Sequence, residues 1–410
     1  MGTNATGEPG ALAVLRAAGA ARRAAGLGRT LSPRARAAGT PGAGPGTGRD
    51  GLLDLASNDY LGLAADPRLA EAAAAAARDW GPGATGSRLV TGTTELHTRL
   101  EDELAAYTRA PRALVFSSGY LANLAAVTAL AQVLGQDRDD AVLIVSDAAN
   151  HASLIDACRL ARARVEVTPH ADVAAVERAL TRRAEPFALV VTDTVFSVAG
   201  DLAPLRDLHR VAAGQRALLV LDEAHAFGVL GPGGRGGAAA AGIAGDPHVI
   251  RTFTLSKSLG SQGGAVAGPA EVIETLIDVG RAFIFDTGLA PPSAAAARAA
   301  LDILRHQPDL GQRARANARR LAALAAGLDF PVSDPAGAVV RVLLGEPGAA
   351  VRAQRICADH GVRVGCFRPP SVPPGQSCLR LTARADLTEV HFELAFRALG
   401  AVRDHVRITA

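Results

Sequence analysis

The stretch VIRTFTLSKSLGSQGGAVAG (Val249–Gly268) decides the fold and carries the most informative residue of the chain. Its two apolar runs, Val249–Thr254 and Gly264–Gly268, flank a loop of small residues. Near-continuous apolar runs bounded by turn residues predict strands buried on both faces of a sheet. The loop holds Lys257, the only lysine among 43 Lys and Arg residues. Arginine stays protonated, whereas lysine can lose its proton and form a Schiff base. We therefore predict a chemical role for Lys257 rather than a place on the surface.

Upstream of this stretch, apolar runs alternate with helical patterns. We expect strands at Ala113–Phe116, Val142–Ser146, Ala188–Asp193 and Ala217–Asp222, and helices between most of them, for example at Tyr120–Leu134 and Val173–Arg183. Such alternation predicts an α/β fold with a mostly parallel sheet.

The chain of 410 residues is too long for one simple core. Residues 1–51 are expected to form a helix (Ala11–Gly26) and a Gly/Pro-rich connection. Residues 52–290 are expected to form the large α/β domain. Residues 291–410 are expected to form a smaller α+β domain, with strands at Val339–Leu344 and Leu379–Thr382 and a closing helix.

Composition narrows the class of protein. The formal net charge is +3 and aromatics make up 4% of the chain, so nothing favours nucleic-acid binding. No apolar run reaches the length of a membrane span, and no secretory signal is visible. The four cysteines show no metal-ligand spacing, which indicates free thiols and a cytoplasmic setting.

Polar residues follow three predicted strands at the point where each ends. Asp193, Asp222 and Thr254 occupy these positions, and Lys257 comes soon after the third. Ligands of open α/β sheets bind beyond the carboxyl ends of the strands. A lysine in such a pocket predicts pyridoxal 5'-phosphate (PLP), a cofactor that forms a Schiff base with lysine.

PLP also needs a carboxylate to hold its ring nitrogen protonated. Asp222 is the candidate, with a helix cap as its alternative role. His225 is placed to reach the ring hydroxyl. His151 is interpreted either as an imidazole stacked on the ring or as a capping or core histidine.

The cofactor phosphate requires hydrogen-bond donors. The segment Ser117–Tyr120, which includes Ser118 and Gly119, lies between a strand and a helix, where backbone amides bind anions. Thr254 and Ser197 can add hydroxyl groups.

Two other motifs favour different functions but lack the required context. GPGATG (Gly81–Gly86) matches a dinucleotide fingerprint, but it follows a helical pattern rather than a strand. DEAH (Asp222–His225) occurs in nucleotide-driven helicases, but the chain has no GxxxxGK[ST] phosphate loop.

Eight motifs resemble those of the PLP-dependent α-oxoamine synthases, in the same order and over nearly the whole chain: SNDYLGL, GATGSRLVTGTTELHTRLE, FSSGYLAN, NHASLIDA, DTVFSVAGDLAPL, DEAHAFGVLGPGGRG, TLSKSLGSQGG and FRPPSVPPGQSCLRLT. The resemblance implies the fold-type I (aspartate aminotransferase-like) architecture, with a large domain of mostly parallel sheet and a smaller C-terminal α+β domain. GSRLVTG and RPPSVPPG favour the branch that joins L-alanine to a pimeloyl thioester, carried by CoA or a carrier protein.

The resemblance also implies roles for individual residues. Lys257 would be the Schiff-base lysine and general base, with Asp222, His225 and His151 around the cofactor ring. Residues matched to the cofactor phosphate and its surroundings are Ser118, Gly119, Tyr120, Ser197, Thr254 and, from the neighbouring subunit of a homodimer, Thr287. Residues matched to substrate contacts are Arg29, Asn58, His151, Arg368, Ser371 and Arg380. Asn58 and Arg380 would hold the amino-acid carboxylate.

Three alternatives compete with this prediction, and the sequence argues against the second and the third. A sister α-oxoamine synthase would use glycine or serine with another acyl-CoA. A non-catalytic partner subunit would be expected to lack the lysine that this chain has. The third alternative, an ATP-driven nucleic-acid enzyme, lacks its phosphate loop.

Overall fold

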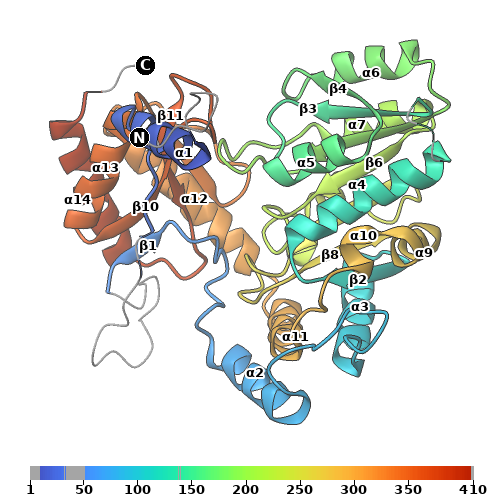
Figure 1. The fold of residues 1–410 in the computed structure, drawn as a ribbon. Coiled ribbons are helices and arrows are strands. Elements are labelled where there is room, and N and C mark those ends of the chain that lie inside the picture. Colours follow the sequence, from blue (N-terminus) through green and yellow to red (C-terminus); the bar gives the residue numbers. More distant parts are fainter. Residues whose placement is uncertain (1–9, 32, 34–50, 137, 139, 408–410) are drawn as a thin grey trace.

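The computed structural model describes residues 10–31, 33, 51–136, 138 and 140–407. Figure 1 shows these residues in two parts, each built around a sheet. The predicted Gly/Pro-rich connection, residues 34–50, lies outside the described residues. The predicted N-terminal helix is α1 (Ala11–Ala24), which ends two residues earlier than expected.

A seven-stranded sheet forms the centre of the larger part. Its order is β2-β8-β7-β6-β5-β3-β4, and only β8 runs antiparallel to its neighbours. The strands are β2 (Arg112–Phe116), β3 (Val142–Asp147), β4 (Arg164–Thr168), β5 (Phe187–Asp193), β6 (Leu218–Asp222), β7 (Val249–Thr254) and β8 (Gly264–Gly268). The predicted mostly parallel sheet is confirmed, and the bounds of β7 and β8 are those expected from sequence.

Helices cover both faces of this sheet (Figure 1). One hydrophobic cluster joins the sheet to α4 (Gly119–Gly135), α5 (Ala152–Leu160), α9 (Ala270–Val279) and α10 (Arg281–Ile284). A second cluster joins the opposite face to α6 (Val173–Arg182), α7 (Leu205–Gly214) and α8 (Gly237–Ala241). A third packs α2 (Pro67–Trp80) and α3 (Glu95–Thr108) against α11 (Pro291–His306). Because both sheet faces are buried, the central strands are apolar along their whole length.

The smaller part has a four-stranded sheet of order β1-β10-β11-β9. The strands are β1 (Leu53–Leu55), β10 (Val362–Phe367), β11 (Ser377–Thr382) and β9 (Val339–Gly345), and the helices are α12 (Leu310–Ala326), α13 (Pro347–Asp359) and α14 (Glu389–His405). The described residues also include a short 3₁₀ helix, Pro232–Gly234, which lies between β6 and α8 in the sequence.

The structure adds three strands that the sequence analysis did not predict: β1, β4 and β10. β1 pairs in parallel with β10, so residues 53–55 belong to the smaller sheet although we assigned them to the large domain. Three residues are too few for a sequence pattern, and the pairing partner lies some three hundred residues away. The remaining domain bounds stay a prediction. Among the described residues, no helix has both the length and the apolar character that crossing a bilayer requires.

Candidate active site

The predicted strand-end residues meet at one edge of the large sheet. Asp193 ends β5 and Asp222 ends β6, and the two are paired in the sheet register. Thr254 ends the next strand, β7, and Lys257 lies three residues beyond it. This is the carboxyl edge, where open α/β sheets bind their ligands.

Lys257 stands at one end of a chain of hydrogen bonds. Its Nζ lies 2.8 Å from His225 Nε2. The other ring nitrogen, Nδ1, lies 2.5 Å from the hydroxyl oxygen of Tyr60. Tyr60 in turn donates to Asn58 Oδ1 at 3.2 Å. A protonated Lys257 donates to Nε2 and so favours the tautomer that carries its proton on Nδ1.

Burial changes the charge state of these groups. Desolvation lowers the pKa of Lys257 to about 8, although the Asp222 carboxylate acts to raise it. Desolvation, helped by Lys257 and Arg380, also holds the pKa of His225 well below its usual value. His225 is therefore neutral at pH 7, and Lys257 is close to the range in which a general base works best.

Asp222 belongs to a second network, centred on Asn123. Asn123 Nδ2 donates to Asp222 Oδ2 at 2.7 Å and lies 2.8 Å from Ser153 Oγ. The Asn123 side-chain oxygen accepts from Thr252 at 2.5 Å. Ser153 Oγ then lies 2.7 Å from His151 Nδ1. The network fixes the Asp222 carboxylate and links it to His151.

Of the two alternative roles, His151 fills its own, whereas Asp222 caps no helix, because the residues that follow it form a turn. His151 caps α5, because its ring accepts from the backbone N–H of Ser153. Asp222 accepts from the backbone N–H of Ala224 at 2.8 Å. The pKa of His151 is lowered by desolvation, and Asp222 opposes this shift.

Arg380 reaches the site from β11 of the smaller sheet. Its Nη1 donates to the Ser197 carbonyl at 2.9 Å, and its Nη2 donates to Asn58 Oδ1 at 3.0 Å. The guanidinium lies 4.6 Å from the ring centroid of Phe367. Arg380 is buried, and its Nε has no hydrogen-bond partner among the described residues. A buried guanidinium with a free donor suits the binding of a carboxylate.

The start of α4 supplies the predicted anion-binding amides. Ser118 caps the helix by accepting from the Leu121 N–H, so the N–H groups of Gly119 and Tyr120 lie outside the helical ladder. A Cβ added at Gly119 would come within 3.1 Å of the Thr254 side chain, which leaves little room there for a larger residue. The Tyr120 side chain points elsewhere, and its hydroxyl donates to Asp156 at 2.6 Å.

The residues matched to the acyl substrate cluster near the end of β10. Arg29 Nη2 donates to Ser371 Oγ at 3.2 Å. Arg368 donates to the carbonyls of Gly26 and Gly28, at 2.7 Å for Gly28. These contacts join the N-terminal segment to the smaller part. In the part of the chain that the structure describes, no hydrogen bond or ion pair joins this cluster to Lys257.

Thr287 is exposed and pairs across an isolated bridge with Ser87. Among the described residues, no hydrogen bond or ion pair joins its side chain to the site in its own chain. Its role in a neighbouring subunit stays a prediction.

Sequence analysis did not identify Tyr60, Asn123, Ser153 or Thr252 as site residues. Tyr60, Asn123 and Ser153 each bond to a predicted residue, and Thr252 bonds to Asn123. Asn123 and Ser153 lie inside helices, where the sequence gives no sign that they face the sheet edge.

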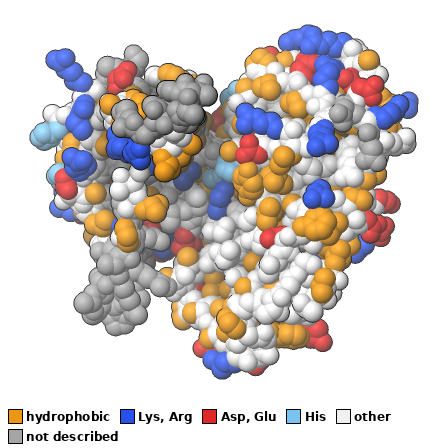
Figure 2. Space-filling view, in the orientation of Figure 1, with side chains coloured by type: hydrophobic (Ala, Val, Ile, Leu, Met, Phe, Trp, Pro, Cys, Tyr) orange, Lys and Arg blue, Asp and Glu red, His pale blue; other side chains and the backbone are white. Residues whose placement is uncertain are grey.

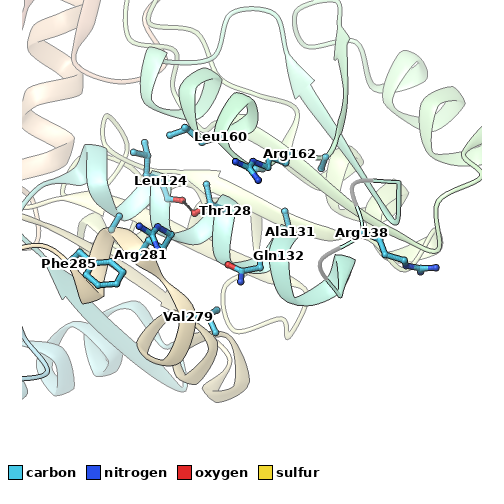
Figure 3. A pocket seen from close by; sticks show the side chains of 13 residues that line it. Leu124, Thr128, Ala131, Gln132, Arg138, Leu160, Arg162, Val279, Arg281 and Phe285 are labelled. Carbon is cyan, nitrogen blue, oxygen red and sulfur yellow. Dashed lines mark hydrogen bonds between the residues drawn. The ribbon is translucent and has the colours of Figure 1, made fainter.

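A groove with a cavity volume of about 800 Å³ lies elsewhere, between α4, α5 and α10 (Figure 3). Its lining includes Leu124, Arg162 and Phe285 but none of the site residues described above. Figure 2 instead shows a hollow between the two parts of the chain, with basic and histidine side chains on its walls.

The residues at the sheet edge fit PLP. They offer an amine of lowered pKa, a fixed carboxylate, backbone N–H groups at the start of a helix, and a buried guanidinium whose Nε has no partner among the described residues. These groups match the aldehyde, ring nitrogen and phosphate of the cofactor and the carboxylate of an amino acid.

Comparison with known proteins gives the same indication. The family model "Aminotransferase class I and II" matches residues 50–399. An 8-amino-7-oxononanoate synthase of a Mycobacterium species is 56% identical over 381 residues, which cover 93% of this chain and 94% of that protein.

Two solved structures are also similar. A structure of SPT (serine palmitoyltransferase) with PLP has 31% identity and a TM-score of 0.80, covering 86% of this chain and 87% of that one. The 8-amino-7-oxononanoate synthase from Francisella tularensis has 28% identity and a TM-score of 0.73, covering 87% of this chain and 98% of that one.

Proposed function

Since the chain belongs to the aminotransferase class I and II family, we propose that it is a PLP-dependent acyltransferase that makes 8-amino-7-oxononanoate for biotin synthesis. L-alanine and a pimeloyl thioester are its substrates. A carbon–carbon bond forms between the alanine Cα and the thioester carbonyl, the thiol leaves, and the alanine carboxyl group is lost as CO2. The free cysteines support a cytoplasmic setting.

One observation carries the proposal. The Nζ atom of the only lysine of the chain lies 2.8 Å from His225 Nε2. The lysine lies at the sheet edge where strand β6 ends with Asp222, and Arg380 of the smaller part contacts Ser197 at this edge. A relative that is 56% identical over 93% of the chain bears the name of this synthase.

When bound, PLP supplies an aldehyde and an electron-withdrawing ring. Lys257 provides the amine for the aldehyde and, when neutral, takes the Cα proton of alanine. Asp222 would supply the negative charge that keeps the ring nitrogen protonated, and its bond from Asn123 keeps the carboxylate in place. His225 would hold the ring hydroxyl, and His151 would hold the ring.

The phosphate is held by Ser118, the amides of Gly119 and Tyr120, Thr254 and the region of Ser197. Thr287 of the partner subunit completes this set in a homodimer. Three large apolar side chains near Thr287 support such an interface: Leu89, Val90 and Phe285 are 52%, 79% and 70% exposed. Exposed apolar groups of this size often mark contact surfaces.

The substrates occupy opposite ends of the site. Arg380 and Asn58 bind the alanine carboxylate, because the guanidinium is buried and has a free donor. Arg29, Arg368 and Ser371 contact the acyl chain at the mouth of the site.

The similarity to serine palmitoyltransferase favours a second candidate, a synthase that uses serine and a longer acyl chain. Incubation of the protein with alanine, serine or glycine and a panel of acyl thioesters separates the two. The mass of 8-amino-7-oxononanoate, formed from alanine and pimeloyl-CoA and absent with Lys257→Ala, is the expected result. A larger product made only from serine would refute the proposal.

A further inference from the structure

One buried acid of the site has no role in the reaction described above. Asp193 is 2% exposed, and neither of its carboxylate oxygens has a hydrogen-bond partner among the described residues. Its backbone is fixed, since its N–H donates to Asn150 Oδ1 at 2.9 Å. Buried polar groups in folded proteins nearly always have a partner, so an unpaired acid at a ligand site indicates a ligand atom.

The charges around Asp193 place it in the site. Asp193 is paired in register with Asp222, and the positive charge of Lys257 acts to lower the pKa of Asp193. Asp147 adds a further negative charge, and the backbone amide of His151 lies close by without meeting hydrogen-bond geometry. Asp193 therefore stands between the strand end that carries Asp222 and the start of the helix that His151 caps.

Two neighbouring carboxylates in a buried site do not both ionise easily. Asp222 accepts from Asn123 and Ala224, which stabilises its negative charge. Asp193 accepts from no described residue, and desolvation together with Asp222 raises its pKa well above the usual value. The proton of the pair consequently resides on Asp193.

We propose that Asp193 is a further cofactor-contacting residue, a carboxylic acid that keeps its proton and donates a hydrogen bond to bound PLP. The inference rests on the PLP site of the proposed function but not on the identity of the amino acid or the thioester. Asp222 provides the negative charge of the site, and Asp193 provides a neutral donor.

Affinity for PLP, measured by equilibrium dialysis, tests the donor. Asp193→Ala is expected to raise the dissociation constant about 5- to 10-fold, the effect of one lost hydrogen bond. Asp193→Asn keeps a donor and should stay within about twofold of wild type. Equal weakening in both variants, or no change in either, would overturn the proposal.

Stability of the PLP-free protein separates this role from a structural one. Asp193→Ala removes a buried polar group without a partner, so the PLP-free variant should melt at the wild-type temperature or higher, while its gain in melting temperature on adding PLP becomes smaller. A lower melting temperature together with unchanged PLP affinity would show a structural role and overturn the inference.

Glu185→Ala is the matched control. Glu185 is also buried, at 9% exposure, but it accepts from Arg164 at the far edge of the sheet. Its loss should lower the melting temperature and leave PLP affinity unchanged. A wild-type protein that binds PLP yet makes no 8-amino-7-oxononanoate would refute the proposed function alone and leave Asp193 to be judged by PLP affinity.

Discussion

Replacement of Asn123 by alanine removes the centre of the network behind Asp222. Asn123 makes one bond to the Asp222 carboxylate, one to Ser153 and one to Thr252, at 2.7, 2.8 and 2.5 Å. A hydrogen bond to a charged group contributes about 1.5–3 kcal/mol, and a neutral one about 0.5–1.5 kcal/mol. Because the three share one side chain and partly compensate, we expect Asn123→Ala to lower the free energy of unfolding by about 2–4 kcal/mol.

Urea unfolding of the PLP-free protein, followed by far-UV circular dichroism, measures this loss. Gln132→Ala is the control, since Gln132 is exposed on the same helix and should change the free energy by less than about 0.5 kcal/mol. A double-mutant cycle with Asp222→Asn should give a coupling energy of at least about 1 kcal/mol. Unfolding of Asn123→Ala at the wild-type midpoint, with additive effects in the cycle, would refute this account of Asp222.

Three further predictions concern the hydrogen-bonded groups around Lys257. The rate at which PLP-free protein takes up PLP should rise about tenfold per pH unit below a midpoint of about 8 and level off above it, because only the neutral amine of Lys257 reacts. A stopped-flow rate that does not change between pH 6 and 9 would contradict this. Arg380→Lys should raise the KM for the amino acid by about 100-fold with a much smaller effect on kcat, because a guanidinium bonds a carboxylate in two places. Arg341→Lys is the control, since Arg341 is paired with Arg380 in the sheet register, and it should change neither constant. Equal effects of the two substitutions would count against Arg380. Tyr60→Phe should lower kcat about 3- to 10-fold at unchanged KM, since His225 loses the group that fixes its tautomer; steady-state kinetics at wild-type kcat would argue against that role.

Sequence patterns predicted the parts of the molecule that depend on local composition. The apolar strands β5, β6 and β7 end in Asp193, Asp222 and Thr254, and their register brings those ends together, as parallel pairing requires. The lone lysine, Lys257, stood out because its chemistry differs from that of arginine.

Contacts between distant segments were beyond the reach of those patterns. β1 is three residues long and joins a strand some three hundred positions later. Asn123 and Tyr60 are ordinary in sequence and gain their importance only from the side chains that packing places beside them. Such residues have no local signal, because their role is set by tertiary contacts rather than by period or spacing.

The two ends of the site are joined through a single amide oxygen. Asn58 Oδ1 accepts from Arg380 and from Tyr60, and the Tyr60 oxygen in turn contacts His225 beside Lys257. A carboxylate that binds Arg380 competes with this oxygen for the guanidinium. Asn58 is then free to strengthen its bond with Tyr60, which favours the imidazole proton on Nδ1 and leaves Nε2 as an acceptor for the lysine. A chain of hydrogen bonds thus connects Arg380 of the smaller part with Lys257 of the larger one.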